Sequence, residues 1–202
     1  MRICTTYRSF ETIIENGIID KIVSLYCDNA DEENICIMYA NGRKHYIGIP
    51  IDSYNSQYGL PVSNDSSLLY VSSWEKGLMA YDIESGALVW RFKASRICDI
   101  AVYDGFIVVK KDSHAIIKLN EKTGEFISEI KSGTILRFNY LNDKFALVDS
   151  IRGKISLVDV HTMQIVRKYP HNFAAVNAYL RGNELHVTGF GEHLVIDRDF
   201  PI

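Results

Sequence analysis

Two histidines near the end of the sequence have the residue type and spacing for proton transfer or metal binding. His186 lies in the segment ELHVTG, and His193 follows the next turn, directly after Glu192. Imidazole suits both tasks because it ionises near neutral pH and its neutral ring nitrogen ligates metals. The three side chains therefore form a candidate acid–base or metal site. A histidine in a strand can equally be an ordinary cross-strand neighbour, and both interpretations stay open.

Sequence motifs of known catalytic sites do not occur. There is no G-x-S-x-G, P-loop, H-E-x-x-H or EF-hand pattern. The segment GFGEH at 189–193 contains G-x-G but lies between two expected strands, with no helix to receive a phosphate. Cys4, Cys27, Cys36 and Cys98 include no C-x-x-C pair, which favours buried thiols in a reducing compartment over a zinc site. We therefore expect no catalytic residue, no cofactor and no metal.

An acidic segment is the clearest charge cluster. Asp31, Glu32 and Glu33 follow Asp28 closely. Such a run is either a solvated loop or a contact for a basic partner. Its oxygen spacing matches no known calcium loop.

Composition places the chain among ordinary globular proteins. It has 202 residues, 47% hydrophobic and 23% charged, with a net charge of −3. The weak negative charge does not favour nucleic acid or an anionic membrane as a partner. No apolar run is long enough for a membrane-spanning helix, and the first residues lack the apolar stretch of a secretion signal. These features predict a single cytoplasmic domain.

A repeat determines the expected architecture. Asp82, Asn120, Asp159 and Asp197 recur at intervals of 38, 39 and 38 residues. Each unit contains short runs of alternating hydrophobicity separated by turn residues, which is typical of antiparallel meanders. Four such strands in about 40 residues indicate a blade of a β-propeller.

The sequence thus predicts an all-β propeller of about five four-stranded blades over residues 1–202. The expected repeats are 18–56, 57–95, 96–133, 134–172 and 173–202, the last together with 1–16. The last unit ends after its third strand, so we expect the N-terminal segment to supply the missing strand and to cover the open edge. Residues 10–19 also fit one face of a short helix, and this alternative stays open.

One unit carries a family resemblance. The segment GLMAYDIESGALVWRFK at 77–93 resembles the repeat of quinoprotein-type β-propellers through Tyr81, Asp82, Gly86 and Trp90. The resemblance covers about 68–200 and implies a propeller fold, which by itself implies no activity. Quinoprotein dehydrogenases bind pyrroloquinoline quinone in a site surrounded by cysteines and aromatic residues. This chain has no adjacent cysteine pair that could contribute to such a site. We therefore expect no quinone cofactor.

Loops that join strands at the ends of the blades form the expected binding surface. Loop tryptophans, tyrosines and arginines are favoured contact residues. The candidate partner-binding residues are Trp74, Glu75, Arg96, Asp112, Arg152, Glu192, Asp31, Glu32, Glu33, Tyr54 and Tyr58.

A monomeric propeller without chemistry is best interpreted as a rigid protein-binding surface, because rigid loops lose little entropy on docking. By size, expected compartment and lack of motifs, the chain resembles bacterial immunity proteins, which neutralise a toxin by covering its active site. That resemblance implies a protein partner, for instance a basic nuclease. Two alternatives stay open: a small propeller hydrolase or lyase using His186, His193 and Glu192, and a structural subunit of a larger assembly.

Overall fold

The computed structural model is built from strands and turns. It describes residues 22–27, 34–39, 44–48, 53–54, 62–65, 67–73, 76–112, 114–131, 135–150, 154–170, 175–181, 184–189 and 193–196. No helix long and apolar enough to span a membrane occurs in this part of the chain.

The strands form five antiparallel sheets in which each strand pairs with its neighbour in sequence. The first sheet contains β1 (Ile22–Cys27), β2 (Asn34–Tyr39) and β3 (Lys44–Gly48). The second contains β4 (Ser53–Tyr54), β5 (Leu68–Ser73), β6 (Gly77–Asp82) and β7 (Leu88–Phe92). The third contains β8 (Ile97–Tyr103), β9 (Phe106–Lys111), β10 (Ala115–Asn120) and β11 (Phe126–Lys131). The fourth contains β12 (Ile135–Tyr140), β13 (Phe145–Ser150), β14 (Lys154–Asp159) and β15 (Gln164–Pro170), and the fifth β16 (Ala175–Arg181), β17 (Glu184–Gly189) and β18 (His193–Ile196).

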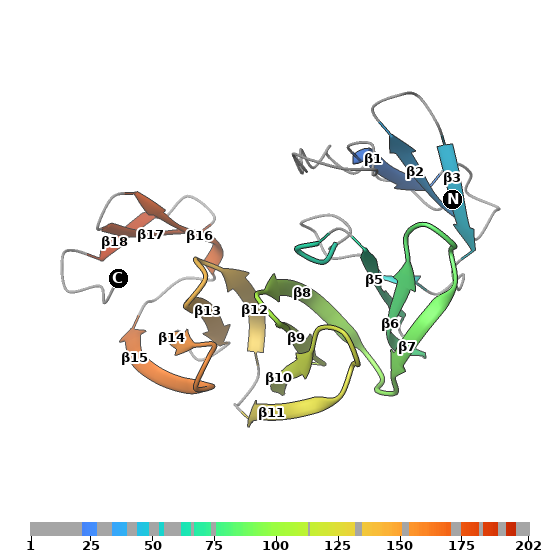
Figure 1. Ribbon diagram of the computed structural model, residues 1–202. Coiled ribbons are helices and arrows are strands. Elements are labelled where there is room, and N and C mark those ends of the chain that lie inside the picture. The colour runs from blue at the N-terminus through green and yellow to red at the C-terminus, as the bar shows by residue number, and fades with distance from the viewer. Residues whose placement is uncertain are drawn as a thin grey trace.

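The sheets follow one another around an arc (Figure 1). Strand β8 lies next to β5 and β12, and β12 lies next to β16, so neighbouring sheets meet through their early strands. The predicted antiparallel meanders are confirmed. The described sheets do not close into a ring, because β1–β3 and β16–β18 stand at the two ends of the arc. Residues 1–16 lie outside the described residues, so closure by the N-terminal segment stays a prediction.

One boundary differs from the expected repeats. The repeat 18–56 assigns Ser53 and Tyr54 to the first blade, whereas β4 pairs with β5, with Ser53 opposite Ser73. These two residues therefore begin the second sheet.

Hydrophobic cores lie between consecutive sheets. Ile107 and Val109 of β9 face Tyr70 and Leu78 of the second sheet. Val108, the residue between these two, points to the opposite side of the sheet and packs in one core with Phe138 of the fourth sheet. Strands β5, β9 and β10 are buried at most of their positions, so both of their faces are covered. A strand that is covered on both faces needs apolar side chains at successive positions.

The repeated Asp or Asn fixes the same turn in successive sheets. Asp82 Oδ1 accepts from the Ser85 amide at 2.7 Å, and Asn120 Oδ1 accepts from Thr123 at 3.0 Å. Asp159 Oδ1 accepts from the Thr162 amide at 2.9 Å. These side-chain acceptors stabilise the turn through contacts within a few residues of the chain.

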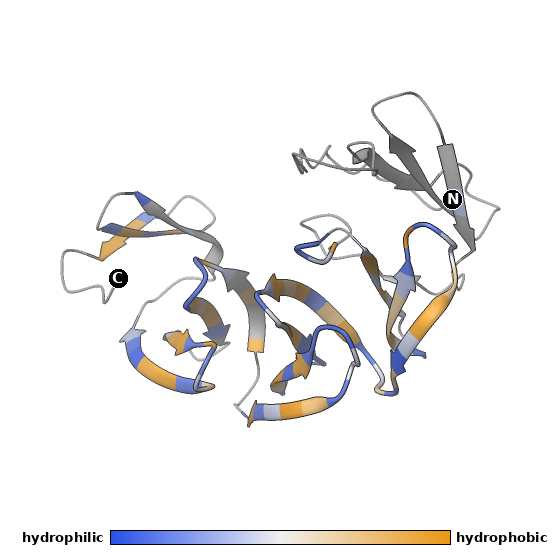
Figure 2. Cartoon of the chain, in the orientation of Figure 1, coloured by the Kyte–Doolittle hydropathy of each residue, from blue (hydrophilic) through white to orange (hydrophobic). Residues whose placement is uncertain are grey.

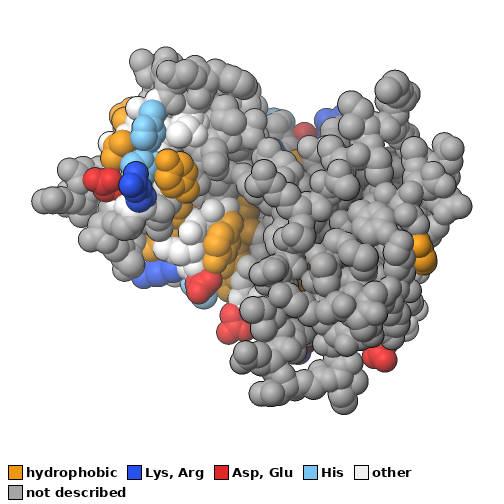
Figure 3. Space-filling view, turned by 90° about the horizontal axis from the view of Figure 1, so that it is seen from above, with side chains coloured by type: hydrophobic (Ala, Val, Ile, Leu, Met, Phe, Trp, Pro, Cys, Tyr) orange, Lys and Arg blue, Asp and Glu red, His pale blue; other side chains and the backbone are white. Residues whose placement is uncertain are grey.

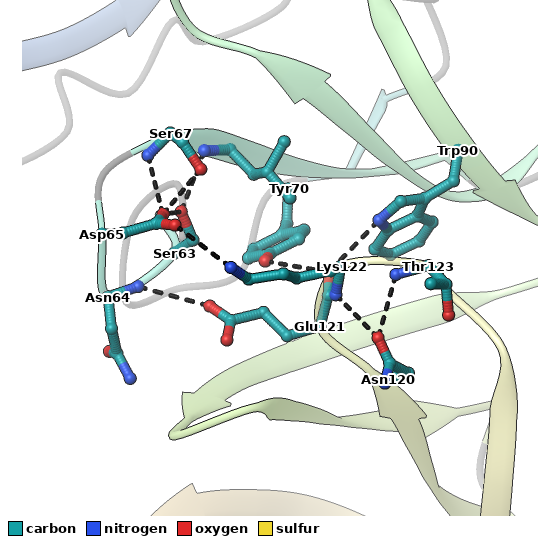
Figure 4. Close-up of polar contacts among 11 residues, drawn as sticks. Ser63, Asn64, Asp65, Ser67, Tyr70, Trp90, Asn120, Glu121, Lys122 and Thr123 are labelled. Carbon is teal, nitrogen blue, oxygen red and sulfur yellow. Dashed lines mark hydrogen bonds and ion pairs between the residues drawn. The ribbon is translucent and has the colours of Figure 1, made fainter.

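A tryptophan joins the second sheet to the third (Figure 4). The Trp90 Nε1–H donates to the carbonyl oxygen of Glu121 at 3.2 Å, and the Tyr70 hydroxyl donates to the same oxygen at 3.3 Å. Gly124 lies directly beneath the indole, since a Cβ there would come within 2.4 Å of the ring. Gly124 also has a φ of 69°, which glycine adopts without strain. The tryptophan and the next unit's glycine therefore form one inter-sheet contact.

The loop before β5 strengthens this joint (Figure 4). The Asn64 amide donates to Glu121 Oε1 at 3.3 Å, and Lys122 Nζ lies 3.8 Å from Asp65 Oδ2. Hydrogen bonds from the Ser67 and Ser63 hydroxyls lower the pKa of Asp65 to about 2.

The next joint uses a lysine in place of the tryptophan. The buried Lys118 ammonium donates to the carbonyl oxygens of Val160 at 3.0 Å and His161 at 2.9 Å, and lies 3.7 Å from the Phe106 ring centroid. Burial lowers the pKa of this lysine. Met163 takes the place of the turn glycine, with a φ of 54°, and its side chain enters the core between the third and fourth sheets. Without an indole above it, the position accepts a side chain.

Candidate functional site

Two of the predicted binding residues meet at one end of the third sheet. The Asp112 amide donates to the Arg96 carbonyl oxygen at 2.7 Å, and Arg96 Nη1 lies 3.6 Å from Asp112 Oδ2. The φ angles of Arg96 and Asp112 are 57° and 55°, a backbone conformation that is unfavourable without glycine. Their ion pair is partly exposed and therefore contributes little to stability. It is an ordered pair of charges that a partner could contact.

The other predicted binding residues are not described. Trp74, Glu75, Arg152, Glu192, Asp31, Glu32, Glu33 and Tyr58 lie outside the described residues, and Tyr54 is described only as part of β4. Their role in binding stays a prediction.

The two histidines of the candidate chemical site lie in contact. His186 Nδ1 lies 2.9 Å from His193 Nε2, and His186 Nε2 lies 3.2 Å from Glu184 Oε2. Among the described residues, Glu184 places its carboxylate next to His186, whereas the expected Glu192 lies outside them. Glu184 and His186 stand two positions apart in β17 and so project from the same face of the sheet.

The surroundings of His186 shield it from solvent. The side chain is buried, because the Tyr179 ring opposite it in β16 stacks on the imidazole with centroids 5.1 Å apart. His193 and Tyr179 are themselves exposed, as are Arg181 and Val195. Figure 3 shows histidine, hydrophobic and charged side chains gathered together on the surface seen from above. We call Tyr179, Glu184, His186 and His193 the histidine cluster.

A second group of polar side chains lies near the start of β8. Lys110 Nζ contacts Asp99 Oδ2 at 3.0 Å, and both side chains are nearly buried. Burial raises the pKa of the neighbouring Cys98 thiol to about 11. Cys98 is therefore a neutral thiol near pH 7 and a poor nucleophile.

The outermost strands expose hydrophobic residues at repeated positions. The pairs are Leu88 and Val89 in β7, Phe126 and Ile127 in β11, and Ile165 and Val166 in β15. Their residues recur at intervals of 38 and 39, as the turn residues do, and they are 37% to 54% exposed. Figure 2 shows these hydrophobic stretches along the outer side of the arc. We call the three pairs the hydrophobic rim.

Several solved structures resemble this arrangement of sheets. BamB from Moraxella catarrhalis matches with a TM-score of 0.57, and the match covers 82% of this chain and 55% of that chain. The dihydro-heme d1 dehydrogenase NirN in complex with DHE matches with a TM-score of 0.63, over 83% of this chain and 42% of that chain. A chain of the mitotic checkpoint complex matches with a TM-score of 0.66, over 94% of this chain and 63% of that chain. All three are β-propeller proteins.

The fold is of the β-propeller class. Sequence identity is 16% in each comparison, so the likeness concerns the fold alone. The chain spans 42% to 63% of the length of these solved chains. No family model and no curated protein matches the sequence.

Sequence reasoning missed two features that it could have found. Glu184 is two residues before His186, a spacing that places both side chains on one face of a strand. The hydrophobic rim follows the repeat, because aligning the units also aligns the three pairs. Tyr179 carries no such signal, since its contact with His186 depends on the register between β16 and β17.

Proposed function

We propose that this chain is a non-catalytic, protein-binding propeller domain. The hydrophobic rim is the observation that supports it best. Single exposed apolar residues are common on soluble proteins, whereas exposed apolar residues that occur together mark contact surfaces. Here the same strand position is apolar and exposed in three successive sheets, which is hard to explain by chance exposure of single residues.

Two largely buried lysines make structural contacts, as expected of a protein whose charged groups serve packing. Lys118 is held by two backbone carbonyls of the next sheet, and Lys110 pairs with Asp99. Through these contacts the charged groups hold neighbouring strands and sheets together. A general acid or base would instead need its polar atom directed at a substrate.

The proposed partner is a toxin, which the chain would neutralise as an immunity protein by covering its active site. A basic toxin such as a nuclease would meet the acidic residues Asp31, Glu32 and Glu33, where charge steers association. The three strands of the hydrophobic rim, β7, β11 and β15, contain four basic residues and one acidic residue, Glu129. The basic residues are Arg91, Lys131, Arg167 and Lys168. The rim would thus contact an apolar or acidic part of the same partner.

Affinity capture from a native lysate tests this function. We expect one protein to be recovered in a fixed ratio to the chain, with binding that weakens as salt increases. Charge reversal at Glu32 and Glu33 should mainly slow association. Recovery of a tightly bound small molecule, with no protein, would contradict the proposal. Self-association of the isolated chain in size-exclusion chromatography would instead favour a structural subunit.

The histidine cluster favours a second candidate, an acid–base hydrolase or lyase. Glu184 is placed to orient His186, which in turn contacts His193, as a carboxylate orients a catalytic imidazole. In this alternative, the exposed His193 takes a proton from the substrate. Turnover of a substrate that is lost in His193→Ala would support it.

A further inference from the structure

A β-bulge interrupts each of the three strands of the hydrophobic rim. In β7 the pairing with β6 shifts between Leu88 and Trp90, so that Val89 is an extra residue. The pairing shifts in the same way at Ile127 in β11 and at Val166 in β15. An extra residue breaks the alternation of a strand, which explains why two successive apolar side chains are exposed at each of these points.

The three bulged strands are also edge strands of their described sheets. An edge strand can pair with a strand of another chain through its free backbone groups, and a bulge is one of the features that hinders such pairing. A partner must therefore contact the hydrophobic rim through side chains. An amphipathic helix can do this, because its own backbone hydrogen bonds are already made.

Basic residues share the outward face of these strands with the extra apolar residues. Arg91 is two positions after Val89, and Lys168 is two positions after Val166, so each basic side chain projects from the same side as the valine. All four side chains are exposed. The opposite face is the inner one, as the burial of Trp90 shows in β7. Each of these two strands therefore presents an apolar and a positively charged side chain together.

The outer strands differ in charge from the chain as a whole. Strands β7, β11 and β15 contain four basic residues and one acidic residue, a net charge of +3, whereas the chain has a net charge of −3. The acidic residue, Glu129, pairs with Lys131 at 2.9 Å and so balances one of the four basic residues. Acidic side chains of a partner are therefore attracted to the outer strands, whereas the outer strands of a second copy are repelled.

We propose that the hydrophobic rim binds an acidic amphipathic helix of a protein partner. Apolar side chains of the helix pack on the exposed pairs, and Asp or Glu side chains on its flank meet Arg91 and Lys168. Stacked sheets lie about 10 Å apart and a helix of about 20 residues is about 30 Å long, so one helix can contact the pairs of two neighbouring sheets. This inference rests on the proposed protein-binding function and specifies the chemistry of the partner.

An anionic membrane matches the same surface less well. Lipid-binding surfaces of the polybasic kind carry clusters of about four to eight Lys or Arg side chains. Here four basic residues are divided among three strands, and one of them is paired with Glu129. The hydrophobic rim also follows the outer side of an arc, so a flat bilayer cannot meet all three pairs at once (Figure 2).

Binding of designed peptides, measured by fluorescence anisotropy, tests the proposal. The probe is a helical peptide of about 20 residues with a leucine stripe at helical spacing and glutamate on both flanks. Two control peptides replace the glutamates by lysine or the leucines by serine. We expect the parent chain to bind the glutamate peptide at least about tenfold more tightly than either control, with an affinity that falls as salt increases.

Charge reversal in the chain separates this proposal from non-specific attraction. The double variant Lys131→Glu and Lys168→Glu should reverse the preference, so that the lysine peptide binds more tightly than the glutamate peptide. Arg181→Glu is the matched control, because Arg181 is an exposed basic residue of the fifth sheet. This control should keep the preference of the parent chain.

Removal of the apolar side chains tests the other half of the contact. The triple variant Val89→Ser, Ile127→Ser and Val166→Ser should bind the glutamate peptide at least about tenfold more weakly than the parent does. Val195→Ser changes a valine of similar exposure in β18 and should bind the peptide as the parent does.

The proposal is wrong if the parent chain does not bind the glutamate peptide, or if it binds the glutamate and lysine peptides equally well. Vesicles of phosphatidylserine and phosphatidylcholine that bind the parent but not the triple variant, with no binding of the peptide, would also overturn it in favour of a lipid surface. These outcomes leave the proposed function standing if the captured protein partner still binds the triple variant more weakly than the parent.

Discussion

Gly124 is required for two separate reasons, and a matched control separates them. Its φ is 69°, and a Cβ would come within 2.4 Å of the Trp90 ring. Gly105 has a similar φ of 78°, but a Cβ there meets no atom within 4 Å. Gly105→Ala should therefore lower the free energy of unfolding by about 1–2 kcal/mol through backbone strain alone. Gly124→Ala should lower it by about 1–3 kcal/mol more, because the indole must move. Chemical denaturation measures both, and equal losses would contradict the close approach of Trp90.

Asp65 makes stability depend on pH at the acidic end. Its folded pKa of about 2 lies below the ordinary pKa of 3.8 for an aspartate, because the Ser67 and Ser63 hydroxyls stabilise the carboxylate. The unfolded chain therefore takes up a proton first as the pH falls. The contribution of Asp65 to stability is present above about pH 4 and is lost as the pH falls towards 2.

Asp65→Asn should accordingly lose less stability than the parent between pH 4 and pH 2. Thermal melting at a series of pH values measures the difference. Parallel curves for the two proteins would show that the hydrogen bonds of Asp65 do not favour the charged form.

At the scale of elements, the joint between the second and third sheets depends on one carbonyl oxygen with two donors. Trp90 and Tyr70 both donate to Glu121 O. Trp90→Phe leaves Tyr70 as donor, and Tyr70→Phe leaves Trp90, so each alone should cost about 1 kcal/mol in hydrogen bonding. Together they leave the buried acceptor without either donor, which costs about 1–3 kcal/mol beyond the two single losses. We expect the double variant to lose more stability than the sum, and strict additivity would rule out a shared acceptor.

The repeat explains how much of these elements could be predicted. Asp82, Asn120 and Asp159 form local turns whose contacts span a few residues, so their spacing predicted the strands correctly. The Trp90–Gly124 contact joins two units, and the sequence showed only its two halves. Tyr179, His186 and His193 came together through the register of three strands, which no local pattern specifies.

At the scale of the whole molecule, the expected closure of the ring can be tested by truncation. Strand β18 is the last strand of a three-stranded described sheet, whereas the three preceding sheets have four strands. If residues 1–16 supply the fourth, removing them exposes an edge that promotes aggregation. We expect the truncated chain to lose solubility or cooperative unfolding. A truncated chain that melts as the parent does would contradict closure by this segment.

The most direct test of the protein-binding function is the dissociation constant of the captured partner for rim variants. The triple variant Val89→Ser, Ile127→Ser and Val166→Ser changes one exposed residue in each outer strand, so its stability should change little. Val195→Ser is the matched control, a valine of similar exposure outside the rim. We predict that the triple variant raises the dissociation constant at least about tenfold, which corresponds to about 1.4 kcal/mol, and that the control leaves it unchanged. Equal affinity of the triple variant and the parent would show that the hydrophobic rim is not the binding surface.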